Sequence, residues 1–395
     1  MFSNIIAPVM DDIVPIMERA ATDQRTFVND LTVGMYKNSE GLIPLMAAVR
    51  KADVQLAVKG RSKEYVGPKG DPEFITSLQN ITFANQHVSD YISGVQTPGG
   101  SSALRLILDL IKLANPNAKI WVSDPTYMNH IPTITATGLS FGLYPFLNRD
   151  TMTLDEAGLF AELGRRGVND VVLFHGSCHN PSGLRLTDNN WKEIARLAKS
   201  RGFLPLFDTA YQGFETGLYE DARGLITVAK AVQRVAISVS CSKNFGLYSD
   251  RTACAYVTSP NQKEADLVHS QMAAVTRATH WVPPNNGAEL VKTILQDEGL
   301  KNLWMEELST INARIRKLRR KLSEALQAEQ GSNYFGYITS QNGMFIMLPM
   351  SIDQMEALRQ EYGIYGLDNG RINIAAIGED KINYIAKSII EILSR

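Results

Sequence analysis

Hydrophobic and polar positions alternate in two ways between about residues 93 and 260. Short runs of apolar and β-branched residues occur at 120–123, 171–174, 204–207, 235–239 and 252–257. Segments between them have helical periodicity: after Thr187, a capping-type residue, Trp191, Ile194 and Ala198 fall on one stripe. Strands that alternate with helices predict an α/β fold, with a mostly parallel sheet, helices on both faces, and functional groups at the carboxyl ends of the strands.

A different pattern follows this region. Apolar residues recur every three or four positions between 308 and 326, which predicts one long amphipathic helix. The basic residues of 314–321 fall between those positions, so we interpret them as a solvated face and not as a polyanion-binding patch. The runs 343–348 and 370–374 predict strands of a smaller α+β lobe.

Composition limits the possible functions. The 395 residues suffice for two domains, or for one large α/β domain with an accessory lobe. With 40 basic and 41 acidic residues the formal charge is -1, so we expect no nucleic-acid and no membrane partner. Cys178, Cys241 and Cys254 and the six histidines lack metal-ligand spacing, so we expect no metal site and a cytoplasmic location. We also expect no export signal and no membrane-spanning segment.

The segment SVSCSKNFGLYSDR, from Ser238 to Arg251, places hydroxyls, a lysine and an arginine at the end of an apolar run. A single lysine there is most often a surface residue. A buried lysine beside a cationic group instead has a lowered pKa and can form a Schiff base. Arg251 and the serines are suited to hold a phosphate next to the amine of Lys243. The combination indicates pyridoxal 5'-phosphate, an aldehyde cofactor that carries a phosphate.

Other strand ends meet the needs of that cofactor. Its ring nitrogen must stay protonated, and Asp208 provides a carboxylate at a second strand end; considered alone, Asp208 could equally be a loop cap. Tyr211 could donate to the phenolate oxygen or simply pack in the core. Gly100, in TPGGS, begins an apolar helix whose N-terminus suits a phosphate. In SCHNPSG the adjacent cysteine and histidine point apart, so Asn180 is favoured over a nucleophile pair.

Six motifs occur together and in the order typical of one family: YVG, TPGGS, CHNPSG, FDTAYQGF, SCSKNFGLYSDR and GRIN. With them the chain resembles, over essentially its whole length, the class I, fold-type I aminotransferases, specifically the aspartate and aromatic amino acid aminotransferase group. The resemblance implies a seven-stranded, mostly parallel sheet flanked by helices, and a smaller α+β domain built from both chain ends. We expect an N-terminal arm and part of the small domain at 1–43, a large cofactor-binding domain at 44–299, and a small domain at 300–395 with a long linking helix at 300–330.

The resemblance also implies roles at the site. Lys243 would attach the cofactor covalently and move the proton at the substrate Cα, Asp208 would hold the pyridinium proton, and Tyr211 and Tyr127 would complete the catalytic set. The residues expected at the cofactor are Gly100, Ser101, Tyr127, Asn180, Asp208, Tyr211, Ser240, Ser242, Lys243 and Arg251, with Tyr65 reaching in from a second subunit and His130 behind Asp208.

A second group of residues is expected at the substrate. These are Gly34, Lys37, Ile43, Asn180, Arg277, Trp281, Val282 and Arg371. Arg371 would grip the α-carboxylate as a bidentate fork, a geometry that lysine cannot provide. In the family that this chain resembles, Tyr65 and Arg277 serve the neighbouring subunit's site, which implies an obligate homodimer.

Three departures from the aspartate-selective pattern make the rim of the substrate pocket more apolar. The ring-stacking residue is Tyr127 where this group usually has Trp, the stretch after Arg277 reads ATHWVPP, and Ile43 and Ser101 resemble the aromatic-tolerant pocket. Burying an aromatic side chain there contributes about 2 kcal/mol. That is comparable to a partly exposed charge-assisted hydrogen bond at about 1.5 to 3 kcal/mol, which Arg277 and Lys37 could still offer a second carboxylate.

These observations predict a pyridoxal-phosphate-dependent transaminase that moves the amino group of Phe, Tyr or Trp to 2-oxoglutarate by a ping-pong mechanism, with residual dicarboxylate activity. Alternatives are an aspartate aminotransferase and a transaminase for a specialised biosynthetic amino acid. A lyase that uses the same cofactor, and a non-catalytic binding module on this fold, are further alternatives. Retention of both Arg371 and Arg277 favours recognition of two carboxylates, and so transamination.

Overall fold

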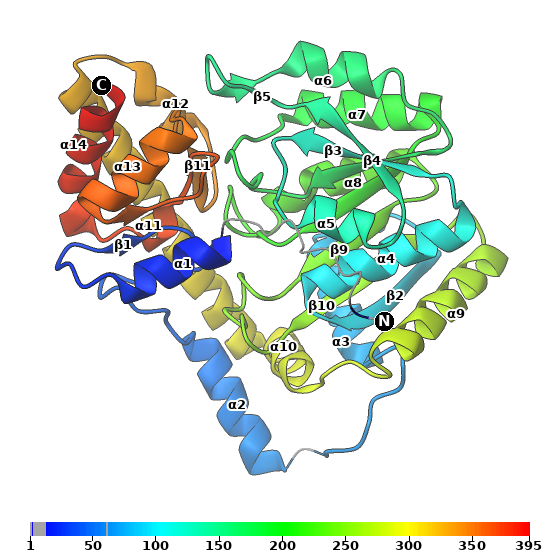
Figure 1. Cartoon of the computed structure of the whole chain (residues 1–395). Helices are drawn as coiled ribbons and strands as arrows, with labels where there is room; N and C mark the ends of the chain where they lie inside the picture. The colour runs from blue at the N-terminus through cyan, green and yellow to red at the C-terminus, as the bar shows by residue number, and fades with distance from the viewer. Residues whose placement is uncertain (1, 3–12, 61) are drawn as a thin grey trace.

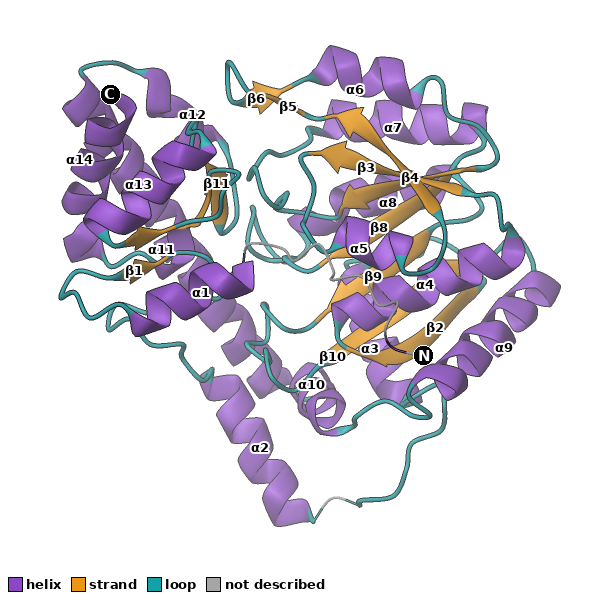
Figure 2. Cartoon of the chain, viewed as in Figure 1, coloured by secondary structure: helices purple, strands orange, loops and turns teal. Residues whose placement is uncertain are grey.

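A seven-stranded sheet forms the centre of the larger part of the molecule. The computed structural model describes residues 2, 13–60 and 62–395. The strands lie in the order β2 (Ile92–Pro98), β10 (Thr252–Thr258), β9 (Ala236–Ser240), β8 (Leu204–Thr209), β7 (Asp170–His175), β3 (Lys119–Asp124) and β4 (Ser140–Pro145). Only β10 runs antiparallel to its neighbours within this sheet. The predicted α/β fold with a mostly parallel sheet is confirmed (Figure 2).

Helices cover both faces of the sheet (Figure 1). Along β8 successive side chains enter different apolar cores, as the period of two in a strand requires: Leu206 enters one and Phe207 the other. The first core is shared with α4 (Gly100–Ala114), α5 (His130–Thr135) and α9 (Gln262–Thr279). The second is shared with α3 (Pro72–Thr82), α6 (Glu156–Leu163), α7 (Asp188–Arg201), α8 (Arg223–Ala231) and α10 (Asn286–Gln296).

Helix α7 shows how the local sequence sets an element. Thr187 caps it: the threonine hydroxyl accepts from the Asn190 backbone N–H, and the Asn190 side chain accepts from the Thr187 backbone N–H. The predicted stripe of Trp191, Ile194 and Ala198 is buried against the sheet. The predicted helix and its inward face are therefore both present.

Both ends of the chain build the smaller lobe. Its elements are α1 (Ile13–Thr22), β1 (Asn29–Asp30), α12 (Tyr337–Ser340), β11 (Phe345–Met347), α13 (Ile352–Tyr362), β12 (Ile364–Tyr365), β13 (Arg371–Asn373) and α14 (Ile382–Leu393). β1 pairs in parallel with β12, and β11 pairs antiparallel with β13. The long helix α11 (Glu298–Gln330) connects the larger part to this lobe and includes the amphipathic stretch predicted between residues 308 and 326.

One prediction for α11 is wrong. Arg316, Lys317 and Arg320 are exposed, as a solvated face requires, but Arg319 is only 2% exposed. Its guanidinium donates to the carbonyl oxygens of Ile338, Asn342, Gly343 and Phe345. Four backbone acceptors thus satisfy a buried cation, an arrangement that the spacing of basic residues did not reveal.

The remaining elements lie at the periphery. β5 (Leu147–Asn148) and β6 (Thr153–Leu154) form a separate hairpin. Helix α2 (Ala47–Lys59) projects from the body of the molecule (Figure 1). None of the helices among the described residues combines the length and apolarity needed to cross a bilayer. The division into 1–43, 44–299 and 300–395 stays a prediction.

Candidate active site

A cavity of about 320 Å³ lies at the carboxyl ends of the central strands, between the sheet and the smaller lobe. It brings together the predicted residues Gly34, Gly100, Ser101, Tyr127, Asn180, Asp208, Tyr211, Ser240, Ser242, Lys243, Arg251 and Arg371. Parallel strands converge at this edge of a sheet, which is why strand-end positions far apart in the sequence share one cavity.

Lys243 follows the end of β9 and is half-buried in the cavity wall. Its Nζ lies 5.7 Å from the centre of the Tyr211 ring. The pKa of this amine is lowered to about 8, mainly by burial; Asp208 acts in the opposite direction, and Arg251 and Arg371 contribute to the lowering. An amine that is partly uncharged near neutral pH is a competent nucleophile and proton acceptor.

Asp208 stands near the end of β8 and is held from two sides. Its Oδ2 lies 3.2 Å from Nε2 of His130, and its Oδ1 accepts a hydrogen bond of 2.9 Å from the hydroxyl of Ser238. Burial alone raises the pKa of the carboxyl, but the contacts with His130 and Ser238 outweigh it and the pKa lies below its ordinary value. A fixed negative charge therefore faces the cavity.

Two more buried histidines stand behind Asp208. The ring of His175 lies 5.2 Å from that of His130 and 4.4 Å from that of His179. Burial lowers the pKa of His175 to about 3 and that of His179 well below its usual range, so both stay neutral at physiological pH. Within the part of the chain that the structure describes, no group of three or more His, Cys, Asp or Glu side chains is arranged to hold a metal.

Cys178 and His179 do not form a nucleophile–base pair. The ring nitrogens of His179 contact the hydroxyls of Ser123 and Ser182, at 2.9 and 2.8 Å. Burial raises the pKa of the Cys178 thiol well above its ordinary value, so the thiol stays protonated and unreactive.

A polar cradle lies at the start of α4. The helix begins at Gly100, so the first backbone N–H groups have no partner within the helix. A Cβ on Gly99 would collide with the guanidinium of Arg251, and one on Gly100 would lie 3.0 Å from Cβ of Ser240. Arg251 is also 3.5 Å from the hydroxyl of Ser242. A cation, two hydroxyls and unpaired N–H groups in one place suit a phosphate.

The smaller lobe contributes Arg371 from β13. This residue is 3% exposed. Its Nη1 donates to Oδ1 of Asn180 at 3.2 Å, and its Nη2 donates to the carbonyl oxygen of Thr32 at 2.5 Å. Its guanidinium carbon lies 4.5 Å from the centre of the Phe345 ring. Backbone, amide and aromatic groups thus orient the fork toward the cavity.

Gly34 lines the cavity with its neighbours Val33 and Met35. A Cβ on Gly34 would lie 2.5 Å from Cζ of Phe345 and 3.4 Å from the hydroxyl of Tyr211. The position therefore requires glycine. No sequence pattern distinguishes Phe345, because a single phenylalanine in an apolar strand has the same pattern as a core residue.

The other predicted site residues do not line this cavity. Tyr65 is 84% exposed and lines, with Val282, a separate cavity of about 440 Å³. Arg277 is exposed, and its guanidinium carbon lies 4.9 Å from the centre of the Trp281 ring. Lys37 and Ile43 likewise lie outside the lining of the active-site cavity. Within one chain, the residues around Lys243 therefore share a cavity, and Tyr65, Arg277, Lys37 and Ile43 lie outside it.

Comparisons with known proteins agree with this geometry. Residues 27–389 match the family model of aminotransferase class I and II. The chain is 36% identical to an aromatic-amino-acid aminotransferase of Paracoccus denitrificans, over 99% of this chain and 100% of the relative. It is also 36% identical to an aspartate aminotransferase of Salmonella typhi over 100% of both.

Solved structures give the same result. An aromatic amino acid aminotransferase with 3-indolebutyric acid matches with a TM-score of 0.95 and 36% identity, over 99% of this chain and 100% of that one. An aromatic-amino-acid aminotransferase from Burkholderia pseudomallei, described as covalently bound to pyridoxal phosphate, matches with a TM-score of 0.96 and 31% identity, over 100% and 99%.

The fold and the site define an aminotransferase. The chain belongs to the class I and II aminotransferase family, and the predicted resemblance to the aspartate and aromatic amino acid group is confirmed.

Proposed function

We propose that this aminotransferase uses pyridoxal 5'-phosphate to move the amino group of an aromatic amino acid to 2-oxoglutarate by a ping-pong mechanism. The observation that carries the proposal is the position of Lys243. Its amine, with a pKa lowered to about 8, lines the same cavity as the Asp208 carboxylate and the polar cradle at the start of α4.

The residues present fit this cofactor. Gly100, Ser101, Ser240, Ser242 and Arg251 would hold its phosphate, which the crowding of Arg251 and Ser240 against the α4 turn supports. Asp208, Tyr127, Tyr211 and Asn180 line the same cavity. Asp208 would pair with the ring nitrogen, Tyr211 and Asn180 would donate to the phenolate oxygen, and Tyr127 would cover the ring face.

When bound, this cofactor supplies an electron sink for negative charge at the substrate Cα. Lys243 Nζ would accept the proton from that carbon and deliver it to the C4' carbon of the cofactor within the same half-reaction, and the second half-reaction would run this transfer in reverse. A pKa near 8 is well matched to both directions. Asp208 keeps a negative charge where a protonated ring nitrogen needs one. Arg371 binds the α-carboxylate as a bidentate fork and fixes which bond at Cα faces Lys243.

We further propose that the enzyme is a homodimer with shared active sites. Apolar side chains stay exposed on one chain, at Leu42, Ile43, Leu45, Val54, Val58, Tyr65 and Trp281. Exposed apolar residues gathered on projecting segments are typical of a subunit interface. In the dimer, the partner subunit's Tyr65 would reach the phosphate and its Arg277 the distal end of the substrate. We place the enzyme in the cytoplasm, since its three cysteines are all free and buried.

Residual activity toward dicarboxylates follows from Arg277 and Lys37, and an aspartate aminotransferase is the alternative function. One relative of equal identity is an aspartate aminotransferase, which favours keeping that candidate. The test mixes the purified, cofactor-loaded protein separately with aspartate, phenylalanine, tyrosine and tryptophan and follows the cofactor's visible absorbance in single half-reactions. We expect the aromatic amino acids to react at least as fast as aspartate. Reaction with aspartate alone would replace the aromatic assignment by the aspartate one.

A further inference from the structure

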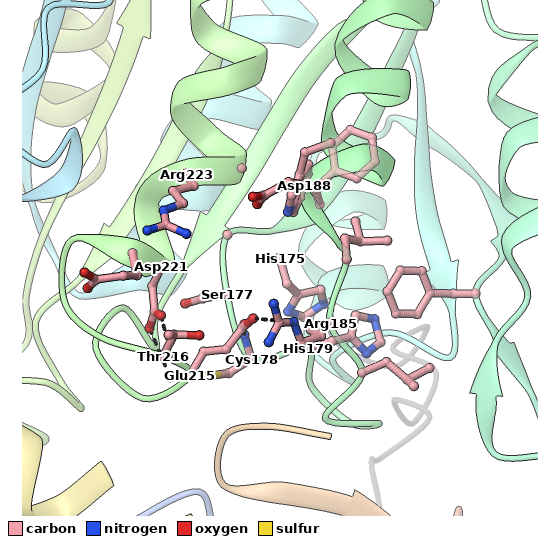
Figure 3. A pocket seen from close by; sticks show the side chains of 18 of the residues that line it. His175, Ser177, Cys178, His179, Arg185, Asp188, Glu215, Thr216, Asp221 and Arg223 are labelled. Carbon is pink, nitrogen blue, oxygen red and sulfur yellow. Dashed lines mark hydrogen bonds and ion pairs between the residues drawn. The ribbon is translucent and has the colours of Figure 1, made fainter. Parts of the chain in front are cut away.

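A second cavity, of about 120 Å³, is lined by residues 174–179, which immediately precede Asn180 in the sequence (Figure 3). The end of β7, the start of α7, the loop after β8 and the start of α8 enclose it. The titratable and charged side chains that line it are Tyr144, His175, Cys178, His179, Arg185, Asp188, Glu215, Glu220, Asp221 and Arg223. The proposed reaction uses none of the acidic groups in this set.

Glu215 joins two segments across this cavity. Its Oε2 accepts a hydrogen bond of 3.1 Å from the backbone N–H of Cys178, and its Oε1 lies 3.5 Å from Nε of Arg185. Figure 3 shows Glu215 and Arg185 linked in this way. The Glu215 side chain is 13% exposed, so its carboxyl is largely shielded from water.

The loop that carries Glu215 is itself fixed. Asp221 Oδ2 accepts from the backbone N–H groups of Gly213 and Glu215, and its Oδ1 accepts from those of Thr216 and Gly217. The acceptor capacity of Asp221 is therefore used within its own loop. Among the described residues of this loop, Glu215 accepts the hydrogen bond from the backbone N–H of Cys178.

Cys178 is an unusual backbone position just before a site residue. Its φ is 50°, a left-handed conformation that costs free energy in a residue with a side chain. A Cβ on Gly343 would lie 2.5 Å from Cβ of Cys178, so the opposite side is closely packed. Two residues further on, Asn180 accepts from Arg371. The contact with Glu215 thus supports the strained start of a segment that ends at the substrate fork.

The charge of Glu215 changes near neutral pH. Burial raises its pKa to about 7, Asp221 adds to the rise, and the Cys178 N–H and Arg185 oppose it. His175 and His179 stay neutral over this range, and burial raises the pKa of Asp221. Because the N–H of Cys178 favours the ionised form, the carboxylate grips that N–H more firmly than the neutral acid does.

We propose that Glu215 is a positioning residue: through the Cys178 amide it holds Asn180 against Arg371, and its ionisation therefore tightens the binding of the substrate carboxylate. The inference rests on the proposed function insofar as it assigns the α-carboxylate to Arg371. It adds a group outside the active-site cavity to the set that governs substrate affinity.

The test is calorimetric binding of 3-indolebutyric acid, a non-reacting carboxylate, to the cofactor-loaded dimer at pH 6 and pH 8.5. Glu215→Gln keeps an acceptor for Cys178 but cannot ionise; Glu220→Gln, an exposed acid on the same cavity, is the control. We expect the ratio of Kd values, Glu215→Gln over wild type, to be near one at pH 6 and about fivefold at pH 8.5. Titrations common to both proteins cancel in this ratio. The control should give a ratio near one at both values.

A ratio for Glu215→Gln that does not change with pH would overturn the inference. If this variant does not fold, Arg185→Gln replaces it. Arg185 lowers the pKa of Glu215, so its removal should shift the pH profile of ligand affinity upward by about half a pH unit relative to wild type. An unmoved profile then counts against the proposal. Failure of the proposed function is seen separately, because a protein that binds with the expected ratios but transfers no amino group keeps the inference and loses the assigned reaction.

Discussion

The guanidinium carbon of Arg277 lies 4.9 Å from the centre of the Trp281 ring, on the exposed end of α9. One charged and one aromatic side chain thus lie together on the surface of one chain, where we propose that they form the rim of the partner subunit's substrate pocket. We predict that Arg277→Ala reduces kcat/KM for aspartate and 2-oxoglutarate by about 100-fold, because a charge-assisted contact worth roughly 3 kcal/mol is lost. The loss for phenylalanine should be below about fivefold. Steady-state kinetics with both substrate classes provides the measurement, and equal losses would refute the model of the rim.

Trp281→Ala is the matched control for that prediction. It removes the aromatic partner and leaves the charge, so phenylalanine should lose more than aspartate does. The expected loss for phenylalanine is about tenfold, from roughly 1.5 kcal/mol of lost aromatic contact.

Lys243→Ala is expected to abolish turnover and the visible absorbance of the covalently held cofactor. The substitution removes the amine whose pKa is lowered to about 8 and which we propose acts at the substrate Cα. Lys243→Arg keeps a positive charge but cannot replace the amine, so it should be equally inactive. Lys230→Ala, on the surface of α8, should leave both properties unchanged. Undiminished turnover in Lys243→Ala would end the proposal of cofactor chemistry.

Ser238→Ala tests the support of Asp208. The variant loses the 2.9 Å hydrogen bond to Asp208 Oδ1, which contributes to the lowered pKa of that carboxyl. We expect kcat to fall about fivefold, equivalent to ~1 kcal/mol. Asp208→Asn removes the charge itself and should cost at least about 100-fold. If the two variants lose kcat to the same extent, Ser238 has a larger part in the site than positioning one oxygen.

Ionisation of Glu215 should also make the free energy of unfolding depend on pH. Its pKa is raised from 4.5 to about 7, so the folded protein binds this proton more tightly than the unfolded chain does. The free energy of unfolding therefore falls as pH rises from 4.5 to 7, by up to roughly 3 kcal/mol, and then stays level. Glu215→Gln lacks this loss, so its Tm relative to wild type should rise between pH 5 and 7. Parallel Tm curves over that range would contradict the assigned ionisation.

Shared sites predict complementation between inactive variants. In a mixed dimer of Lys243→Ala and Arg277→Ala chains, one site combines an intact Lys243 with the partner subunit's Arg277. Random exchange should restore about a quarter of wild-type aspartate activity, since half the dimers are mixed and each has one complete site. Activity equal to the average of the two separate variants would show that each subunit uses its own Arg277.

The strand-end residues could be predicted because parallel topology fixes where they meet. Lys243, Asp208 and Asn180 each follow an apolar run, and the sheet brings such positions to one edge. The partner of Ser238 could not be predicted in this way. Sequence placed Ser238 with the phosphate-binding serines, whereas the register of β8 and β9 sets it beside Asp208. Register between parallel strands depends on the packing of both sheet faces and leaves no local pattern.

Buried polar contacts between distant segments could not be predicted either, because they too leave no local sequence pattern. Arg319 stands at a position whose spacing is typical of a surface residue. Only the fold of residues 338–345 shows that four backbone carbonyl oxygens accept hydrogen bonds from it. Glu215 likewise has no motif: its importance comes from the backbone conformation of Cys178 in another loop. Sequence patterns report the periodicity of one element, and these contacts join two.

The contact between Arg371 and Thr32 spans 339 residues of sequence. During synthesis on the ribosome, the cavity wall formed by Val33, Gly34 and Met35 emerges early, whereas Arg371, on the same cavity, emerges close to the end. The sheet and Lys243 can assemble long before then, but the anion-binding fork cannot. A nascent or prematurely terminated chain that ends before residue 371 would therefore lack the means to grip a substrate, however complete its sheet.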